Sequence, residues 1–303
     1  MMRIIKRTIR LDYAELIPLW IAVFIDILGF TILIPFLPFF SKEYGAPAWQ
    51  TGLLLATNAM FGFFSGPIWG NLSDRYGRKP MLLLSQLGTL AGFLMLAFSK
   101  GMPMLFASRI VDGIFGGNFP IAKAVIGDVV PPKERSRHMS NIGVAHVLAS
   151  LVGPGLGGLL SDWGTIASGL FCTALTCITI AVTFRSLRES NPPEKRSRAE
   201  ISEQSNTNSI NIWRNSTARY LLIQWGFHTM SFMIYVSCIA LFANLLLGLD
   251  SKEMGLLLMA AGVVRVLVRF LVFIPLLERL GDRRTSMLGL AIFVVVYLLL
   301  GFV

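Results

Sequence analysis

The chain of 303 residues has a composition that excludes an ordinary water-soluble protein. Hydrophobic residues make up 54% of the sequence, charged residues only 15%, and the mean hydropathy is +0.65. The net charge of +10 would suit a nucleic-acid-binding protein, but Lys and Arg fall in short clusters between apolar runs rather than on one polar face. We therefore expect an all-α, multi-pass membrane protein that binds no nucleic acid.

Nine apolar stretches are long enough to cross a bilayer. About 20 residues are needed, because about 30 Å of hydrocarbon offers the backbone no water partners. The stretches cover residues 17–40, 51–70, 81–99, 104–126, 140–160, 165–184, 220–247, 254–277 and 285–303. The first is longer than the apolar core of a signal peptide and has no small-residue cleavage site, so we interpret it as a span.

Basic residues predict the orientation of the spans, because cytoplasmic loops carry an excess of Lys and Arg. One set of alternate connections, together with the N-terminal tail, holds Arg3, Lys6, Arg7, Arg10, Arg75, Arg78, Lys79, Lys133, Arg135, Arg137, Arg185, Arg188, Lys195, Arg196, Arg198, Arg214, Arg219, Arg279, Arg283 and Arg284. The opposite connections contain only Lys42, Lys100 and Lys252. We expect a cytoplasmic N-terminus in a plasma or inner membrane, with Val303 on the outer side.

A polar stretch divides the spans into two groups. Residues 185–217 include Pro192 and Pro193 and are rich in Ser, Asn, Arg and Glu, a composition that cannot bury a core. We expect a six-helix bundle over 1–184, a flexible cytoplasmic linker over 185–217 and a partial bundle of three helices over 218–303. A weak repeat supports two halves, because residues 70–79 after the second span are echoed by 280–284 after the eighth.

The connection after the second span gathers turn-forming and charged residues, namely Gly70, Asp74, Arg75, Gly77, Arg78 and Lys79. The two glycines permit a tight turn, Asp74 is placed to cap a helix start, and Pro80 fits the first turn of the next helix. The alternative is a simple basic hairpin. Such a hairpin does not require this combination of charges, and we interpret the connection as a gating loop.

The fifth span is marked by small residues and a proline: Gly143, Gly153, Pro154, Gly157 and Gly158. Gly153 and Gly157 form a GxxxG face that lets another helix approach closely, and Pro154 removes an amide that would bond to the Ser150 carbonyl. We expect a kinked helix with a smooth face. Ordinary close packing is the alternative interpretation.

Ionisable residues within the spans are candidates for function, because a charge at the bilayer centre costs at least about 2.5–3.5 kcal/mol. Asp26 lies near the middle of the first span, while Arg109 and Asp112 share a face of the fourth. A carboxyl exposed alternately to the two sides of a membrane can exchange a proton with each. Asp26 is our first candidate for proton coupling and Asp112 the second, with Arg109 tuning them. A static ion pair and a neutral, hydrogen-bonded Asp26 are the alternatives.

Further polar residues lie in the spans of the second half. Arg265 and Arg269 in the eighth span, together with His228 in the seventh, are candidates for a substrate cavity. For Arg265, static pairing is an equally open interpretation. His146 in the fifth span and His228 each stand alone, which is more typical of a hydrogen-bonded structural histidine than of a proton relay.

Four of these segments resemble sequence motifs of the major facilitator superfamily, and they occur in the same order along the chain. Residues 70–79 resemble its signature loop, 108–113 its fourth-helix Arg motif, and 143–158 the fifth-helix motif of its antiporters. Asp26-x-x-Gly29, followed by Pro35 and Pro38, resembles the first helix of the drug-efflux branch, including the tetracycline/proton antiporters.

The resemblance implies specific contacts. Arg78 is implied to pair with Asp128 at the inner end of the fourth helix, and Asp74 to face an eleventh helix. This chain holds about nine of twelve helices, so that partner of Asp74 is missing from the sequence. The tetracycline exporters carry an additional acid in the third helix, and the matching position here is Gly92.

We therefore expect proton-driven antiport of a small lipophilic or cationic compound out of the cytoplasm. The partners are that compound, protons and the lipid bilayer; the sequence sets no oligomeric state. No phosphate-binding GxxxxGK[ST] loop, metal-ligand spacing or paired nucleophile and base occurs in the sequence, so we expect no cofactor, no metal and no enzyme. The alternatives are a proton-coupled symporter of a sugar or organic anion, in which Arg265 could serve, and a non-transporting truncated fragment.

Overall fold

The computed structural model describes residues 16–33, 36–194 and 216–300, and within these ranges every regular element is helical. The expected all-α class is confirmed. The N-terminal tail 1–15, most of the expected linker (195–215) and residues 301–303 lie outside the described residues. The helices are α2 (Ile17–Leu33), α3 (Leu37–Glu43), α4 (Ala48–Tyr76), α5 (Arg78–Ala97), α6 (Met102–Ile114), α7 (Asn118–Val129), α8 (Pro132–Ser161), α9 (Gly164–Ser186), α11 (Ser216–Leu247), α12 (Ser251–Val268) and α13 (Ile274–Leu300), with a π-helical turn, Arg269–Phe273, between the last two.

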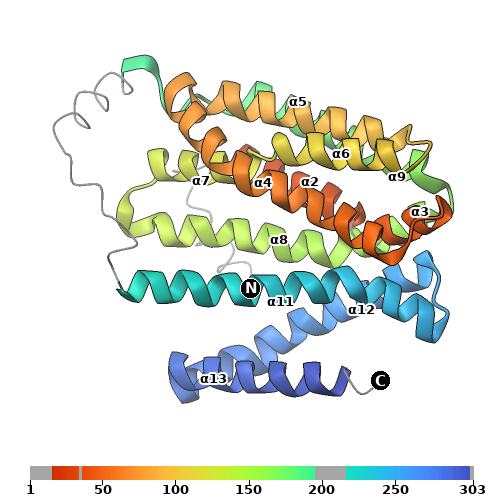
Figure 1. Cartoon of the computed structure of the whole chain (residues 1–303). Helices are drawn as coiled ribbons and strands as arrows, with labels where there is room; N and C mark the ends of the chain where they lie inside the picture. The colour runs from red at the N-terminus through yellow and green to blue at the C-terminus, as the bar shows by residue number, and fades with distance from the viewer. Residues whose placement is uncertain (1–15, 34–35, 195–215, 301–303) are drawn as a thin grey trace.

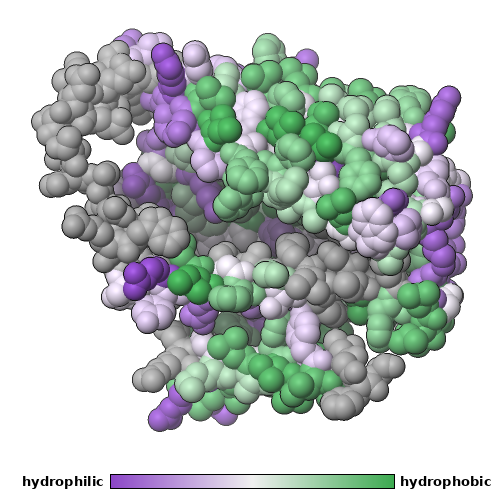
Figure 2. Space-filling model, in the orientation of Figure 1, coloured by the Kyte–Doolittle hydropathy of each residue, from purple (hydrophilic) through white to green (hydrophobic). Residues whose placement is uncertain are grey.

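Each of the nine expected spans falls on helix within the described residues, although the helix ends differ. By length and composition, five segments can cross a membrane: Ile17–Glu43, Arg78–Ala97, Pro132–Ser161, Gly164–Ser186 and Ser251–Leu277. Apolar residues cover much of the face seen in Figure 2, with hydrophilic residues gathered toward the ends of the helices. Many large apolar side chains of the described residues are exposed, such as Phe63 at 76% exposure, which is typical of a lipid-facing surface.

The first half of the chain packs into one bundle (Figure 1). Helix α2 lies against α8 and α9, while α5 lies against α6 and α9, and α4 covers α6. Two apolar clusters fill the spaces between them, one around Ile121 and Ile126, the other around Ile32 and Leu96. The second half is attached to this bundle mainly through α12, which packs on α8.

The fourth expected span, residues 104–126, is broken into α6 and α7 at residues 115–117. Gly116 and Gly117 weaken the helix, and Pro120 has no N–H to give to the Gly116 carbonyl. Side chains from neighbouring helices bond to backbone groups at the break. Ser65 Oγ donates to the Gly113 carbonyl at 2.8 Å, Trp69 Nε1 to the Ile114 carbonyl at 2.7 Å, and Ser85 Oγ to the Phe115 carbonyl.

Two helices pack closely against the small residues of α8. On one face, a Cβ at Gly157 would lie 2.5 Å from the Ile32 carbonyl oxygen, and one at Gly153 would also meet α2, at Thr31. On the other face, a Cβ at Gly255 of α12 would lie 2.6 Å from the Pro154 carbonyl oxygen. Gly143 differs, because nothing lies within 4 Å of a Cβ there. The expected close approach of a helix at 153–157 is therefore present, and α8 remains one helix through Pro154.

The eighth expected span also differs from a simple helix. Pro275 has no N–H for the Leu271 carbonyl, and the backbone there forms the π turn, Arg269–Phe273. Gly281 has φ +75°, which breaks α13 at the start of the repeat 280–284. The ninth span begins beyond this kink.

Candidate functional site

The first half of the chain forms an open cavity of about 350 Å³ beside the break in the fourth span. Its wall comes from α2, α4, α5, α6, α7 and α8, with Gly116 from the break. The lining residues are Val23, Asp26, Ile27, Phe30, Asn58, Thr89, Phe93, Asp112, Gly116, Asn118, Phe119 and His146. The cavity thus combines two carboxyl groups with amide, hydroxyl and imidazole groups and three aromatic rings.

Asp112 is held by charged and polar neighbours. Asn58 Nδ2 donates to its Oδ2 at 2.8 Å, and Arg109 Nη1 lies 3.4 Å from the same oxygen. Arg109 is 1% exposed, and its guanidinium lies 5.8 Å from the centre of the Phe93 ring. Arg109 and Asp112 share a helix face, as the sequence predicts, and they form a buried ion pair, which was the alternative interpretation.

Asp26 is placed in the same cavity but in a different setting. Its Oδ1 is buried and accepts no hydrogen bond from the residues that the structure describes. The Oδ1 of Asn118, across the break in the fourth span, is likewise buried and unpartnered within that part of the chain. A buried acceptor without a hydrogen-bond donor costs free energy. Both oxygens belong to residues that line the cavity, where a bound molecule could supply the donor.

Gly92 of α5 lies directly against this site. A Cβ at residue 92 would be 3.0 Å from the Asp112 Cβ and 3.2 Å from the Ser108 carbonyl oxygen. This is the position where the resemblance implies an additional acid in the tetracycline exporters. In this chain the glycine leaves room for the backbone of α6, and the carboxyl groups of the cavity are those of Asp26 and Asp112.

The candidates from the second half lie elsewhere. Arg265, Arg269 and His228 do not line this cavity, and the His228 ring packs 5.8 Å from that of Phe293. Their assignment to a substrate cavity stays a prediction. His146, interpreted from the sequence as a structural residue, lines the cavity. Sequence reasoning also missed Asn58, Thr89 and Asn118, since polar residues are unremarkable within a helix until their neighbours are known.

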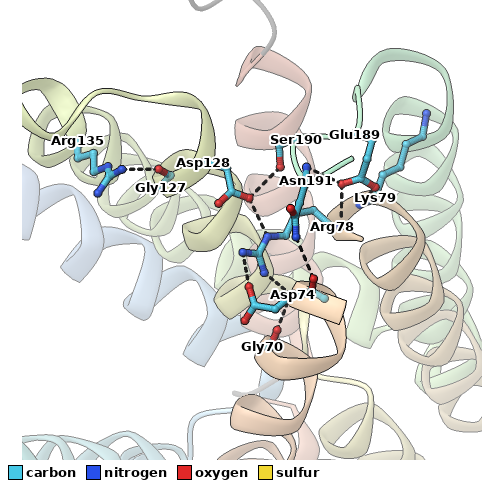
Figure 3. Close-up of polar contacts among 11 residues, drawn as sticks. Gly70, Asp74, Arg78, Lys79, Gly127, Asp128, Arg135, Glu189, Ser190 and Asn191 are labelled. Carbon is cyan, nitrogen blue, oxygen red and sulfur yellow. Dashed lines mark hydrogen bonds and ion pairs between the residues drawn. The ribbon is translucent and has the colours of Figure 1, made fainter. Parts of the chain in front are cut away.

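The expected gating loop forms a second polar site, shown in Figure 3. Arg78 begins α5 and is only 6% exposed. Its Nε donates to Asp128 Oδ2 at 2.8 Å, its Nη1 donates to Ser73 Oγ at 2.7 Å, and its Nη2 pairs with Asp74 at 2.5 Å. The pairing of Arg78 with Asp128 that the resemblance implies is therefore present.

Gly77 makes the turn between α4 and α5 possible, because its φ of +107° is strained for any residue with a Cβ. The other loop residues lie around it. Arg75 packs over the Tyr76 ring at 5.7 Å, Lys79 Nζ donates to the Phe184 carbonyl at 2.7 Å, and the Gly70 carbonyl accepts from Ser73 Oγ at 2.8 Å.

The prediction that Asp74 caps a helix is wrong. Asp74 pairs with Arg78, and the two carboxylate oxygens of Glu189 accept from the backbone N–H groups of Arg78 and Lys79, at 2.9 and 3.1 Å. A carboxylate is favoured at this position by the partial positive charge of a helix N-terminus. The sequence could not predict this cap, because Glu189 lies more than 100 residues from the start of α5, the helix that it caps.

The first residues of the expected linker therefore dock on the loop. Ser190 Oγ donates to Asp128 Oδ2 at 3.2 Å, and Asn191 Nδ2 donates to the Asp74 carbonyl at 2.9 Å, as Figure 3 shows. Of the segment expected as a linker from residue 185, residues 185–186 belong to α9 and residues 189–191 contact the loop. Residues 195–215 lie outside the part of the chain that the structure describes.

Replacing Glu189 by Ala is expected to destabilise the loop, since two N–H groups of α5 lose their acceptor. A lost cap costs about 0.5–2 kcal/mol, and a chain of this size should melt roughly 2–4 °C lower per kcal/mol. Thermal unfolding of the purified protein in detergent measures the shift. Glu194→Ala, which removes an exposed carboxylate just beyond the docked residues, is the control, and an equal shift in both variants would contradict the capping role.

Comparisons with known proteins agree with this architecture. A tetracycline resistance protein of class H from Pasteurella multocida is 28% identical over 283 residues, 92% of this chain and 71% of that protein. A class B tetracycline resistance protein from Escherichia coli is 27% identical, covering 88% and 67%. The multidrug resistance protein MdtG of Proteus mirabilis is 28% identical, covering 91% and 71%.

Two solved structures share the fold. A human organic anion transporter, MFSD10, superposes with a TM-score of 0.65 at 21% identity, covering 84% of this chain and 70% of that one. A bacterial homologue of the human lysosomal transporter Spinster, inward-facing and unoccupied, gives 0.62 at 17% identity, covering 90% and 64%. The family model of the Major Facilitator Superfamily matches residues 19–303. The chain therefore belongs to the Major Facilitator Superfamily of membrane transporters.

Proposed function

We propose that this protein is a proton-coupled antiporter that exports a small lipophilic compound from the cytoplasm. Its curated relatives include tetracycline and multidrug resistance proteins, which supports export of a small molecule. The cavity size of about 350 Å³ and its aromatic lining suit a compact ring-containing compound. Basic residues on alternate connections support a cytoplasmic N-terminus in the cell membrane.

The contrast between Asp26 and Asp112 carries this proposal. Asp112 has the counter-charge of Arg109 and the amide of Asn58, whereas Asp26 Oδ1 has no hydrogen-bond donor among the described residues. An uncompensated carboxylate in an apolar wall is costly until a proton or a donor group of the substrate reaches it. Proton and substrate would therefore compete for Asp26, and this competition is what exchange of one for the other requires.

Reconstitution into vesicles tests the proposal. The purified chain is placed in liposomes that contain a trapped pH-sensitive dye, and tetracycline or ethidium is added under an imposed proton gradient. We expect substrate-dependent proton movement that is missing from protein-free vesicles. If substrate crosses at the same rate with and without the gradient, and no proton moves, the antiport assignment is wrong.

Arg78 is proposed to stabilise a closed inner gate together with Asp74 and Asp128. Arg78→Ala removes two ion pairs and the bond to Ser73, and charged hydrogen bonds contribute about 1.5–3 kcal/mol each. We expect transport to slow by about tenfold or more. Initial rates for two substrates measure this, and their ratio should stay unchanged, because the loop does not line the cavity.

Arg78→Lys is the graded control for this experiment. Lysine keeps the charge but lacks the planar fork that contacts Ser73, Asp74 and Asp128 together, so an intermediate rate is expected. A changed substrate preference at an unchanged rate would contradict the gating role.

A further inference from the structure

An exposed lysine, Lys123, packs against a residue of the cavity wall in the second part of the fourth span. Lys123 lies on α7, one helical turn after Phe119, and its Nζ is 4.3 Å from the centre of the Phe119 ring. Phe119 lines the cavity. The core-facing residues of α7 are Ile121, Ala122, Val125 and Ile126, so Lys123 occupies the opposite face, which it shares with Phe119.

The direction of the side chain argues against a simple interfacial lysine. Lysines near the inner end of a span normally extend toward the headgroups, to keep the ammonium in water. Here the ammonium lies over Phe119, on the N-terminal side of its own Cα and therefore toward the break in the fourth span. The charge is placed beside the cavity rather than toward Asp128, which already has Arg78 and Ser190.

Some charged and polar groups near the cavity are paired, and others have no partner among the described residues. Arg109 and Asp112 neutralise each other, and Asp26 and Asn118 each present a buried, unpartnered acceptor oxygen in the described part of the chain. The contact that holds the Lys123 ammonium is a ring face, and no carboxylate of the described residues lies within ion-pair distance of it. The site thus offers acceptors in its wall and a cation at its rim.

We propose that Lys123 recognises an acidic group on the transported compound, so that the substrates are amphoteric aromatic molecules with an acidic group and a hydrogen-bond donor. The acidic group lies at Lys123, the ring against Phe119, and the donor at Asp26 or Asn118. This inference rests on the proposed function, because it names the substrate class of the same cavity. It narrows the expectation of a lipophilic or cationic compound to one that carries charges or dipoles of both signs.

Two fluorescent compounds that differ in a single carboxylate test the proposal. Nε-dansyl-lysine and dansylcadaverine share the same ring, chain and amine, and only the former has the carboxylate. Their binding to the purified protein in detergent is followed by the rise in dansyl emission in an apolar site. We expect the wild type to bind dansyl-lysine about tenfold more tightly, the effect of one charge-assisted hydrogen bond.

Substitutions of Lys123 test whether this side chain causes the preference for the compound with the carboxylate. Lys123→Gln should reduce the affinity for dansyl-lysine about tenfold and leave dansylcadaverine unchanged or slightly tighter, while Lys123→Arg should keep the preference. Lys133→Gln, at an exposed lysine at the start of α8, is the matched control. Retained binding of dansylcadaverine shows an intact cavity in each variant, and a monodisperse peak in size-exclusion chromatography shows independently that the variant is folded.

Equal affinities of the wild type for the two compounds, including no binding of either, would overturn the proposal, as would an equal loss of both in a folded Lys123→Gln protein. These measurements use no proton gradient. If the protein does not prefer dansyl-lysine but still moves protons on substrate addition in vesicles, the proposed substrate class is wrong and the antiport function is supported.

Discussion

Asp26→Asn is expected to abolish proton coupling while the protein remains folded in the membrane. Asparagine has nearly the same volume as aspartate, but its amide cannot take up or release a proton. In vesicles, substrate-dependent proton movement should fall to the level of protein-free vesicles. Downhill exchange of labelled against unlabelled substrate should persist, because it requires rearrangement of the helices but no net proton transfer.

The control for this variant is Asp162→Asn. Asp162 is also a carboxylate, but it follows α8, its side chain is 53% exposed and lies 3.4 Å from Lys252 Nζ, and it is not among the residues that line the cavity. Its substitution should leave proton movement at the wild-type level. Wild-type proton movement in a well-folded Asp26→Asn protein would refute the coupling role and direct attention to Asp112.

Gly157→Leu is expected to prevent normal assembly of the first bundle. A Cβ at this position already meets the Phe36 ring and lies 2.5 Å from the Ile32 carbonyl oxygen. Backbone atoms of α2 cannot move aside as a flexible side chain can, so the cost should reach the upper end of overpacking penalties, about 3 kcal/mol or more. Loss of the monodisperse peak in size-exclusion chromatography, or a strongly lowered melting temperature, measures the effect.

Gly143→Leu provides a matched control on the same helix. Nothing lies within 4 Å of a Cβ there, and leucine forms helix more readily than glycine by several tenths of a kcal/mol. This variant should assemble normally. Similar behaviour of the two variants would show that the α2–α8 contact is looser than the structure has it, and the smooth face of α8 would lose its structural explanation.

Local spacing explains what could be predicted from the sequence. Long apolar stretches identify the helices, and residues three apart on one helix, such as Arg109 and Asp112, must share a face. The glycines at 153 and 157 likewise predict a close helix approach before its partner is known. Each of these statements concerns one helix, whose geometry is nearly fixed.

Contacts between distant segments could not be predicted in this way. Glu189 caps a helix that begins at Arg78, and nothing in the neighbouring residues indicates that contact. The break in the fourth span was also missed, because its apolar pattern continues through Gly116 and Gly117, and the compensating bonds come from Ser65, Trp69 and Ser85 on other helices. Lys123 becomes a candidate for substrate recognition only once its position over Phe119 is known.

The break between α6 and α7 lets these two parts of the fourth span change direction independently. Just before the break, the carbonyls of Gly113 and Ile114 accept hydrogen bonds from side chains of α4, which can follow a small rotation by changing their own torsions. Bending an unbroken helix would instead rupture its main-chain bonds. A change in the direction of α7 near Asp128 would therefore leave the Arg109–Asp112 pair on α6 in place, so that the buried ion pair and the Arg78–Asp128 contact belong to two separate helical segments.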